Sequence, residues 1–208
     1  MANLTMKMLQ EQINELKTEI STLKSNGVAT VAKKNFGNLG IGDTFELAGL
    51  KWTILDITEN GYMCLADRLK DSRQFDSTCN DWKSSDLRHF LNTEFYKKLA
   101  DEIGEDNIIT FDRDLLSMDG QTEYGTCEDK VSLLTVDEYR AHRKLILNAD
   151  YWWWLIAPYS TKCNDDTTWD TVVSSSGRIG WRYCFNFHGG VRPVCILKSN
   201  IFVSKKGE

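Results

Sequence analysis

The sequence has no hydrophobic run long enough to cross a membrane and no excess of basic residues. No window reaches about eighteen consecutive apolar residues, the length that a transmembrane helix needs. The 208 residues include 25 Lys and Arg against 30 Asp and Glu, a net charge of −5. Because nucleic-acid binding needs clustered positive charge, we expect no nucleic-acid partner and no insertion into a membrane. Residues 1–7 are not followed by a short apolar block, so we expect no secretory signal.

The cysteines also lack the spacing that metal binding or thiol redox chemistry uses. None of the six belongs to a Cys-x-x-Cys pair, and none of the three histidines adjoins a Cys or Ser in a nucleophile pattern. In a chain without a secretory signal we expect mostly reduced thiols, with Cys184 and Cys195 as small buried hydrophobic residues. We therefore predict no catalytic residue, no cofactor and no enzyme activity.

Alternating apolar residues and turn signals predict several short strands. Residues 43–57 are predicted to form a hairpin around a turn at Ala48-Gly49-Leu50. Tyr62–Leu65 follows an Asn-Gly turn and is predicted to be a third strand. Closing strands are expected at residues 191–197 and 200–204.

Two helices are predicted between these strands. The first covers residues 85–103, is capped by Ser84 or Ser85, and carries a stripe of apolar residues at helical spacing. The second begins at Thr135, whose hydroxyl forms a capping box with Glu138. Strands and helices in this order predict an α+β domain with mixed short β-sheets and two helices.

The last quarter of the chain encloses a polar and aromatic stretch between two apolar ends, Tyr151–Leu155 and Gly189–Leu197. Tyr and Trp offer large contact area at low conformational cost, and Asn, Ser and Gly offer adaptable hydrogen bonds. The composition is therefore typical of a recognition surface, with a β-rich core and long loops as the alternative. Four rings alternate with other residues and are predicted to share one face of a strand: Trp181, Tyr183, Phe185 and Phe187.

Three motifs follow one another in this segment. They are Trp153-Trp154-Leu155, Val173-Ser174-Ser175-Ser176-Gly177, and Gly190-Val191-Arg192-Pro193 before an apolar strand. Their order resembles that in the C-type-lectin-like domains of phage and gut-bacterial proteins, including the variable proteins of diversity-generating retroelements. Ile156-Ala157-Pro158 departs from the Arg-Ser-Pro usual there, at a position expected to differ among variable proteins.

Upstream segments at residues 52–56, 82–96 and 132–138 are also similar to this family, so the resemblance covers about residues 45–203. It implies a C-type-lectin-like fold with a loop-rich C-terminal half. It also implies that the Trp-Trp pair and Arg192 are scaffold. We expect Arg192 to be buried against a carboxylate or a backbone carbonyl.

The resemblance is to the lectin-like fold and not to its calcium-dependent sugar site. Asp165, Asp166 and Asp170 lie close together in the sequence, and oxygen-rich loops can bind calcium. However, their spacing is not that of an EF-hand, and the Glu-Pro-Asn, Gln-Pro-Asp and Trp-Asn-Asp motifs of calcium-dependent lectins are absent. We therefore expect no required metal ion.

The N-terminal residues carry a heptad pattern. Met6, Ile13 and Ile20 take a positions, and Leu9, Leu16 and Leu23 take d positions. We predict an oligomerising coiled coil over residues 1–26, formed through residues 6–23, and one ligand-binding domain over residues 27–208. Ile at a with Leu at d favours a dimer, whereas analogy with phage fibres favours a trimer. An amphipathic helix packed on its own domain is the alternative.

We expect ligand binding at the remaining polar and aromatic positions between residues 156 and 188. Exposed aromatic clusters are costly unless they meet a partner, and Trp, Tyr and Arg are enriched at interface hot spots. Burial of the alternating rings in the core is the alternative. The predicted ligand-binding residues are Tyr159, Asn164, Asp166, Trp169, Asp170, Arg178, Trp181, Tyr183, Phe185, Phe187 and His188.

These observations predict a non-enzymatic protein that presents a variable, aromatic-rich surface to a protein or glycan on a target cell. The resemblance implies a phage receptor-binding or tail-associated protein, a retroelement target, made in the bacterial cytoplasm and carried in the virion. One alternative is an enzyme on the related formylglycine-generating fold, with Cys184 and Cys195 as a reactive pair. Another is a structural virion component whose aromatic strand is buried by a neighbouring subunit.

Overall fold

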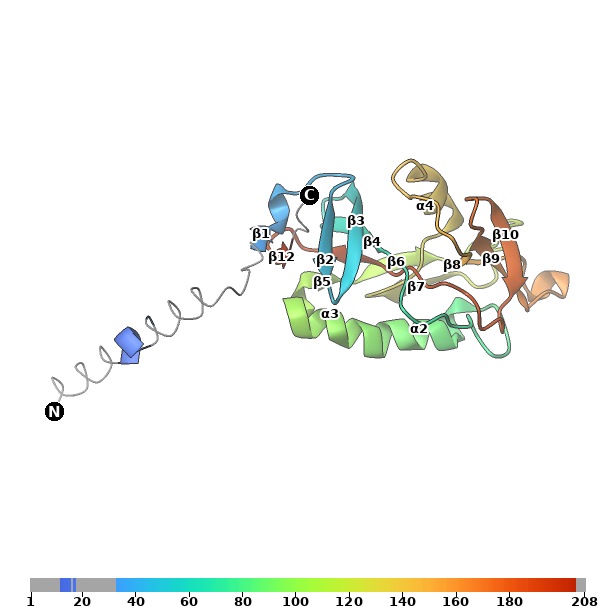
Figure 1. Cartoon of the computed structure of the whole chain (residues 1–208). Coiled ribbons are helices and arrows are strands. Elements are labelled where there is room, and N and C mark those ends of the chain that lie inside the picture. Colours follow the sequence, from blue (N-terminus) through green and yellow to red (C-terminus); the bar gives the residue numbers. More distant parts are fainter. Residues whose placement is uncertain (1–11, 16, 18–32, 205–208) are drawn as a thin grey trace. The chain divides into compact units, whose positions relative to one another are not determined.

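The computed structural model describes residues 12–15, 17 and 33–204 (Figure 1). Most of the predicted coiled coil of residues 6–23 lies outside the described residues. Residues 12–15 and 17 are helical, and the coiled coil and its oligomeric state stay predictions. Within the described ranges, no helix combines the length and the apolar character needed to cross a membrane.

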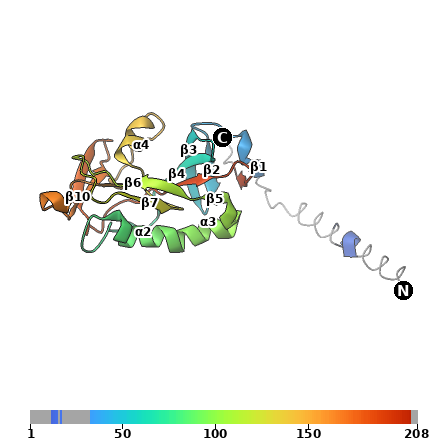
Figure 2. The same cartoon turned by 180° about the vertical axis from the view of Figure 1, so that it is seen from behind.

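Residues 33–204 belong to one α+β unit with small antiparallel sheets and few helices, as predicted (Figures 1 and 2). The strands of the largest sheet are β1 (Lys33–Asn35), β2 (Thr44–Leu47), β3 (Leu50–Ile57), β4 (Tyr62–Ala66), β5 (Ile108–Ile109), β11 (Val194–Leu197) and β12 (Phe202–Ser204). Their order is β1-β12-β2-β3-β4-β11-β5. The first and last strands of this unit, β1 and β12, are therefore neighbours and pair with each other.

The remaining strands form two smaller sheets. They are β6 (Phe111–Asp114), β7 (Thr126–Asp129), β8 (Trp153–Pro158), β9 (Trp169–Val173) and β10 (Ile179–Tyr183). β6 pairs with β7, while the other three form a sheet in the order β10-β9-β8. β8 is buried along its whole length, whereas β10 is exposed or half-buried. This three-stranded sheet therefore joins the core to the surface.

The predicted first hairpin is confirmed, but its turn is one residue shorter than predicted, because Leu50 already pairs with Leu47 as the first residue of β3. β2 and β3 pair antiparallel from Thr44 opposite Thr53 to Leu47 opposite Leu50. The two turn residues, Ala48 and Gly49, have φ values of 53° and 73°, the left-handed conformation that a two-residue hairpin turn requires. The predicted strand after it is β4.

The predicted first helix is also confirmed in its bounds. It runs through α2 (Asp86–Phe90), the π-helical segment η3 (Leu91–Phe95) and α3 (Tyr96–Ile103). The Ser85 hydroxyl accepts a hydrogen bond from the Arg88 amide at 3.1 Å and caps its start. Gly104, with φ of 83°, ends it. The π-helical turn was not predicted. The predicted apolar stripe packs into a hydrophobic core of the unit, where Leu87, Leu91, Phe95 and Leu99 are buried.

α4 (Val136–Ala141) carries the predicted capping box. The Glu138 amide donates to the Thr135 hydroxyl at 3.0 Å, and the Thr135 amide donates to the Glu138 carboxylate at 2.7 Å. Two backbone donors at the start of the helix are thereby satisfied by two side chains.

Arg192 is buried, as predicted, just before β11. Its Nε donates to the Ala66 carbonyl at 3.1 Å, and its Nη2 lies 3.5 Å from the Asp67 carboxylate. β11 then enters the main sheet between β4 and β5. The C-terminal segment is therefore built into the framework of the unit.

Trp154 joins β8 to the segment before β11. Its indole is buried and donates to the Arg73 carbonyl at 2.9 Å, and its backbone N–H donates to the Gly190 carbonyl at 3.1 Å. A Cβ on Gly189 would collide with the Trp154 indole, and a Cβ on Gly190 would lie 2.6 Å from the Tyr151 ring. The two glycines are therefore required by a close approach of the backbone to the buried Trp154 ring and the half-buried Tyr151 ring.

We predict that Gly189→Ala destabilises the unit by about 1–3 kcal/mol, because the added methyl overpacks a buried indole that cannot move aside. Gly40→Ala is the matched control, since a Cβ at Gly40 meets no heavy atom within 4 Å. Chemical denaturation of both variants checks this. Equal free energies of unfolding would contradict the proposed role of the Gly189 contact.

Candidate functional site

Five aromatic side chains gather at one end of the three-stranded sheet. We call Tyr159, Trp169, Trp181, Tyr183 and Phe185 the aromatic surface. Tyr183 lies directly opposite Trp169 on the neighbouring strand, and their rings stack with centroids 3.7 Å apart. Phe185 stacks on the other side of Tyr183 at 5.0 Å, and Tyr159 packs against Trp181 at 4.9 Å. Each ring is thus positioned by another ring.

The aromatic surface is open to solvent. Trp181 is 47% exposed, and Tyr183 and Phe185 are each 43% exposed, while Tyr159 and Trp169 are half-buried. The alternative that these rings pack inside the monomer is therefore wrong. Contiguous exposed apolar surface of this kind marks sites of interaction on soluble proteins.

The predicted strand of alternating rings is shorter than expected. β10 ends at Tyr183, because the Cys184 carbonyl accepts hydrogen bonds from the amides of Phe75 and Asp76 at 2.8 and 3.1 Å. Asn186 then turns back, donating its amide to the Tyr183 carbonyl at 2.9 Å. Phe185 therefore joins the aromatic surface from a turn, not from a strand.

Three further predicted residues are exposed but lie apart from the five rings. Phe187 is 67% exposed and lines a shallow hollow with residues 72–74 and 86–87. His188 follows it in the same turn-rich segment. Arg178 lies at the opposite end of β10, where its Nε donates to the Ser176 hydroxyl at 3.3 Å.

The predicted polar residues of the 160s hold the adjoining loop in place. The Asn164 side-chain amide donates to Asp119 at 2.9 Å and to Ser160 at 3.1 Å. The Asp166 carboxylate accepts from the backbone amides of Thr168 and Trp169 at 3.1 and 3.2 Å. These bonds order the chain that leads into β9 and support the rings above it.

Asp170 was predicted on the loop side and is instead fully buried in β9. One of its carboxylate oxygens accepts the Thr171 amide at 2.9 Å, and the other has no partner among the described residues. Burial raises the pKa of Asp170 well above its ordinary value, and the single bond from Thr171 does not offset this. Asp170 is therefore a core residue and not a ligand contact.

Two residues that hold the site were not predicted. Asn80 is fully buried and donates to the carbonyls of Ser160 and Trp169 at 3.0 and 2.7 Å, while it accepts from the Tyr124 hydroxyl at 2.8 Å. Asp119 accepts from the Ser160 hydroxyl at 2.7 Å. Burial alone would raise the pKa of Asp119, but its hydrogen bonds from Ser117, Ser160 and Asn164 lower it overall.

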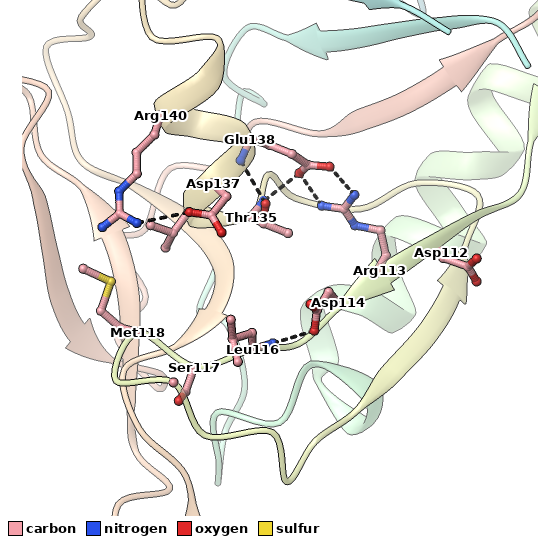
Figure 3. Close-up of a pocket in the computed structure, with 12 residues that line it drawn as sticks. Asp112, Arg113, Asp114, Leu116, Ser117, Met118, Thr135, Asp137, Glu138 and Arg140 are labelled. Carbon is pink, nitrogen blue, oxygen red and sulfur yellow. Dashed lines mark hydrogen bonds and ion pairs between the residues drawn. The ribbon is translucent and has the colours of Figure 1, made fainter. Parts of the chain in front are cut away.

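A separate pocket of about 370 Å³ lies between α4 on one side and β6 with the segment that follows it on the other (Figure 3). Arg113 donates to both carboxylate oxygens of Glu138, at 2.7 and 2.6 Å. Burial alone would raise the pKa of Glu138, but this pairing lowers it overall. The Arg113 guanidinium and the Glu138 carboxylate form an ion pair with each other, and this pair joins β6 to α4.

The cysteines do not form a reactive pair. All six are free, and Cys184 and Cys195 are both buried. Cys195 lies opposite Cys64 across the β4–β11 ladder. Burial raises the pKa of Cys184 to about 12, and burial also raises the pKa of Cys195. Both thiols are therefore held in the protonated, poorly nucleophilic form.

We predict that Asp170→Asn makes the unit more stable at neutral pH. Below about pH 3.8 the wild-type carboxyl is neutral in both the folded and unfolded chain. As the pH rises from there toward the raised pKa of the folded state, only the unfolded chain ionises, and wild type loses up to about 1.4 kcal/mol per pH unit.

Urea denaturation between about pH 4 and pH 8 measures this difference. The variant's advantage should grow with pH, whereas the exposed control Asp165→Asn should follow wild type. A constant difference between Asp170→Asn and wild type across that range would contradict a raised pKa of Asp170 in the folded chain.

Comparison with known proteins gives one result. No curated protein and no solved structure shows significant similarity to the chain. The sequence does match a protein family described as "Domain of unknown function (DUF6273)" over residues 59–199. This range covers 141 of the 208 residues and contains all five rings of the aromatic surface. The chain therefore belongs to the DUF6273 family.

Proposed function

We propose that this chain is a non-enzymatic binding protein whose aromatic surface contacts a protein or a glycan on a target cell. The observation that carries the proposal is the exposed group of rings in which Tyr183 stacks with Trp169 and Phe185, while Trp181 packs against Tyr159. Large aromatic side chains lose little conformational entropy on binding, and rings that already brace one another lose less. Such a group is costly to expose unless a partner covers it.

We propose in addition that the α+β unit has a C-type-lectin-like fold. Support comes from the pairing of its first and last strands, β1 and β12. Further support is that residues of the matching motifs are buried, whereas the rings between these motifs are exposed. Trp153 and Trp154 are buried in β8, and Arg192 is buried before β11.

The biological setting that we propose is a phage receptor-binding or tail-associated protein in the virion, diversified by a retroelement. A coiled coil of residues 6–23 would join two or three copies, and several linked sites bind more strongly than one. A surface whose side chains lie outside the core can change its residues at little cost to folding. Residues 159–185 contain side chains of this kind.

Two alternatives are less well supported. An enzyme on the formylglycine-generating fold needs a reactive cysteine, whereas the pKa values of Cys184 and Cys195 are raised by burial. A structural virion component would cover the aromatic surface with a neighbouring subunit. The binding experiment below separates that case from the proposed one, because a covered surface does not bind cells.

We predict that Trp181→Ser and Tyr183→Ser each weaken binding of the full chain to its target cell by roughly thirtyfold, as expected for a hot-spot ring that contributes about 2 kcal/mol. The assay applies the fluorescently labelled chain to a panel of gut-bacterial strains and titrates the strains that bind. Leu147→Ser is the matched control, because Leu147 is an exposed apolar residue outside the aromatic surface. Equal binding by all three variants and wild type would contradict the proposal.

A further inference from the structure

β10 is the outer strand of its sheet, and its outer edge is open at the backbone amides. The Trp181 and Tyr183 carbonyls on that edge already accept from the Arg182 guanidinium and the Asn186 amide, at 2.8 and 2.9 Å. In the order β10-β9-β8, β9 is its only neighbour. The outer side of β8, in contrast, is covered, since the amides of Trp154 and Ile156 donate to the carbonyls of Gly190 and Leu134 at 3.1 and 3.0 Å. Figure 1 shows β10 at the end of the unit opposite β1 and β12.

The hydrogen bonds at the two ends of the β9–β10 ladder show which backbone groups face outward. Ser174 donates to the Arg178 carbonyl, and Cys184 donates to the Thr168 carbonyl, both at 2.8 Å. In an antiparallel ladder the hydrogen-bonded residues alternate, so the even-numbered residues of β10 face β9. The amides of Ile179, Trp181 and Tyr183 therefore point to the open edge, and no other segment of the described chain accepts from them.

The two faces of β10 differ in character. Ile179, Trp181 and Tyr183 lie on the face that carries the aromatic surface. Arg178 and Arg182 lie on the other face with Gly180 between them, and the Arg182 guanidinium lies 5.6 Å from the centre of the Trp152 ring. A strand added to this edge would place alternate side chains beside aromatic rings and beside two arginines.

The segment that contains β10 carries basic side chains but no acidic ones. The chain has 30 acidic residues, yet no Asp or Glu occurs from residue 171 to residue 207. The β6–β7 ribbon, by comparison, carries Asp112, Asp114 and Glu128, and charged side chains on edges discourage pairing with other strands. The β10 edge, with arginines and no acidic side chain, is complementary to an acidic strand.

We propose that β10 pairs edge to edge with an extended peptide segment in which apolar and acidic residues alternate. Backbone hydrogen bonds to the three outward amides would supply affinity. The alternation would supply specificity, with apolar side chains against Trp181 and Tyr183 and carboxylates near Arg178 and Arg182. This inference rests on the proposed binding function and narrows its ligand to a protein strand.

The experiment titrates the ¹⁵N-labelled full chain with the blocked peptide Glu-Val-Glu-Ile-Glu-Val and measures amide hydrogen exchange by NMR. We expect the amides of Ile179, Trp181 and Tyr183 to exchange rapidly in the free protein and to become protected when the peptide binds. The matched peptide Lys-Val-Lys-Ile-Lys-Val should bind more weakly. Each pair of opposite charges on neighbouring strands contributes little to binding. We therefore expect Arg182→Glu to weaken binding of the acidic peptide by roughly 1.4- to 5-fold.

Several outcomes would overturn the proposal. One is the absence of any shift at about millimolar peptide, the weak end of specific affinities. Another is a shift without protection of the three amides, which would place the peptide on the rings and leave the proposed function intact. A third is protection already present in the free protein together with concentration-dependent sedimentation, which would assign the edge to a second copy of the chain.

A pair of proline variants tests the backbone directly. Ile179→Pro removes an outward amide without removing a ladder bond, which an edge strand tolerates, and should abolish protection at the edge. Ser175→Pro places proline in the turn of the same hairpin, at the position where turns accept it, and should leave peptide binding at the wild-type level. If only Trp181→Ser weakened the peptide while Ile179→Pro did not, the ligand would use the rings and not the edge.

Discussion

The close approach of Gly189 and Gly190 to the rings of Trp154 and Tyr151 is the constraint on which the candidate site depends. A side chain at either glycine would push the chain away from β8, and β8 is the strand on which β9 and β10 are built. Because Trp154 also donates to Arg73, three distant segments meet at one buried indole. The chain between β8 and β11 is thereby anchored at both ends by the core, and its outermost strand, β10, faces outward.

This anchoring explains how one sheet can be both framework and surface. Val172 and Val173 are buried on the two sides of β9, so the middle strand is core. One strand further out, Trp181 and Tyr183 have neighbours on one side only and are exposed. Their rings are ordered by Tyr159, Trp169 and Phe185 and not by the core. A preorganised binding surface needs side chains that are ordered although they are exposed. The conformational entropy of the rings is then lost during folding and not during binding.

Local signals in the sequence were sufficient for the elements whose stability is local. The hairpin formed by β2 and β3 and the capping box at Thr135 need only neighbouring residues, and both were predicted, the hairpin with a turn one residue too long. Asp170 could not be placed, because β9 is buried on both faces and alternation does not tell its inner positions from its outer ones. The end of β10 was missed because the Cys184 carbonyl accepts hydrogen bonds from amides more than a hundred residues earlier in the chain. Asn80 was missed because the carbonyls to which it donates, those of Ser160 and Trp169, are also distant in the sequence.

The central claim is that the aromatic surface stays open in the intact protein, including any assembly formed through residues 6–23. Hydroxyl-radical footprinting of the full-length protein in its native oligomeric state, read by mass spectrometry, measures this directly. The account predicts that Trp181, Tyr183 and Phe185 are oxidised much faster than the buried Trp82 and Trp154. Protection of all three exposed rings to the level of the buried tryptophans would contradict it, because the surface would then be an internal contact of the assembly.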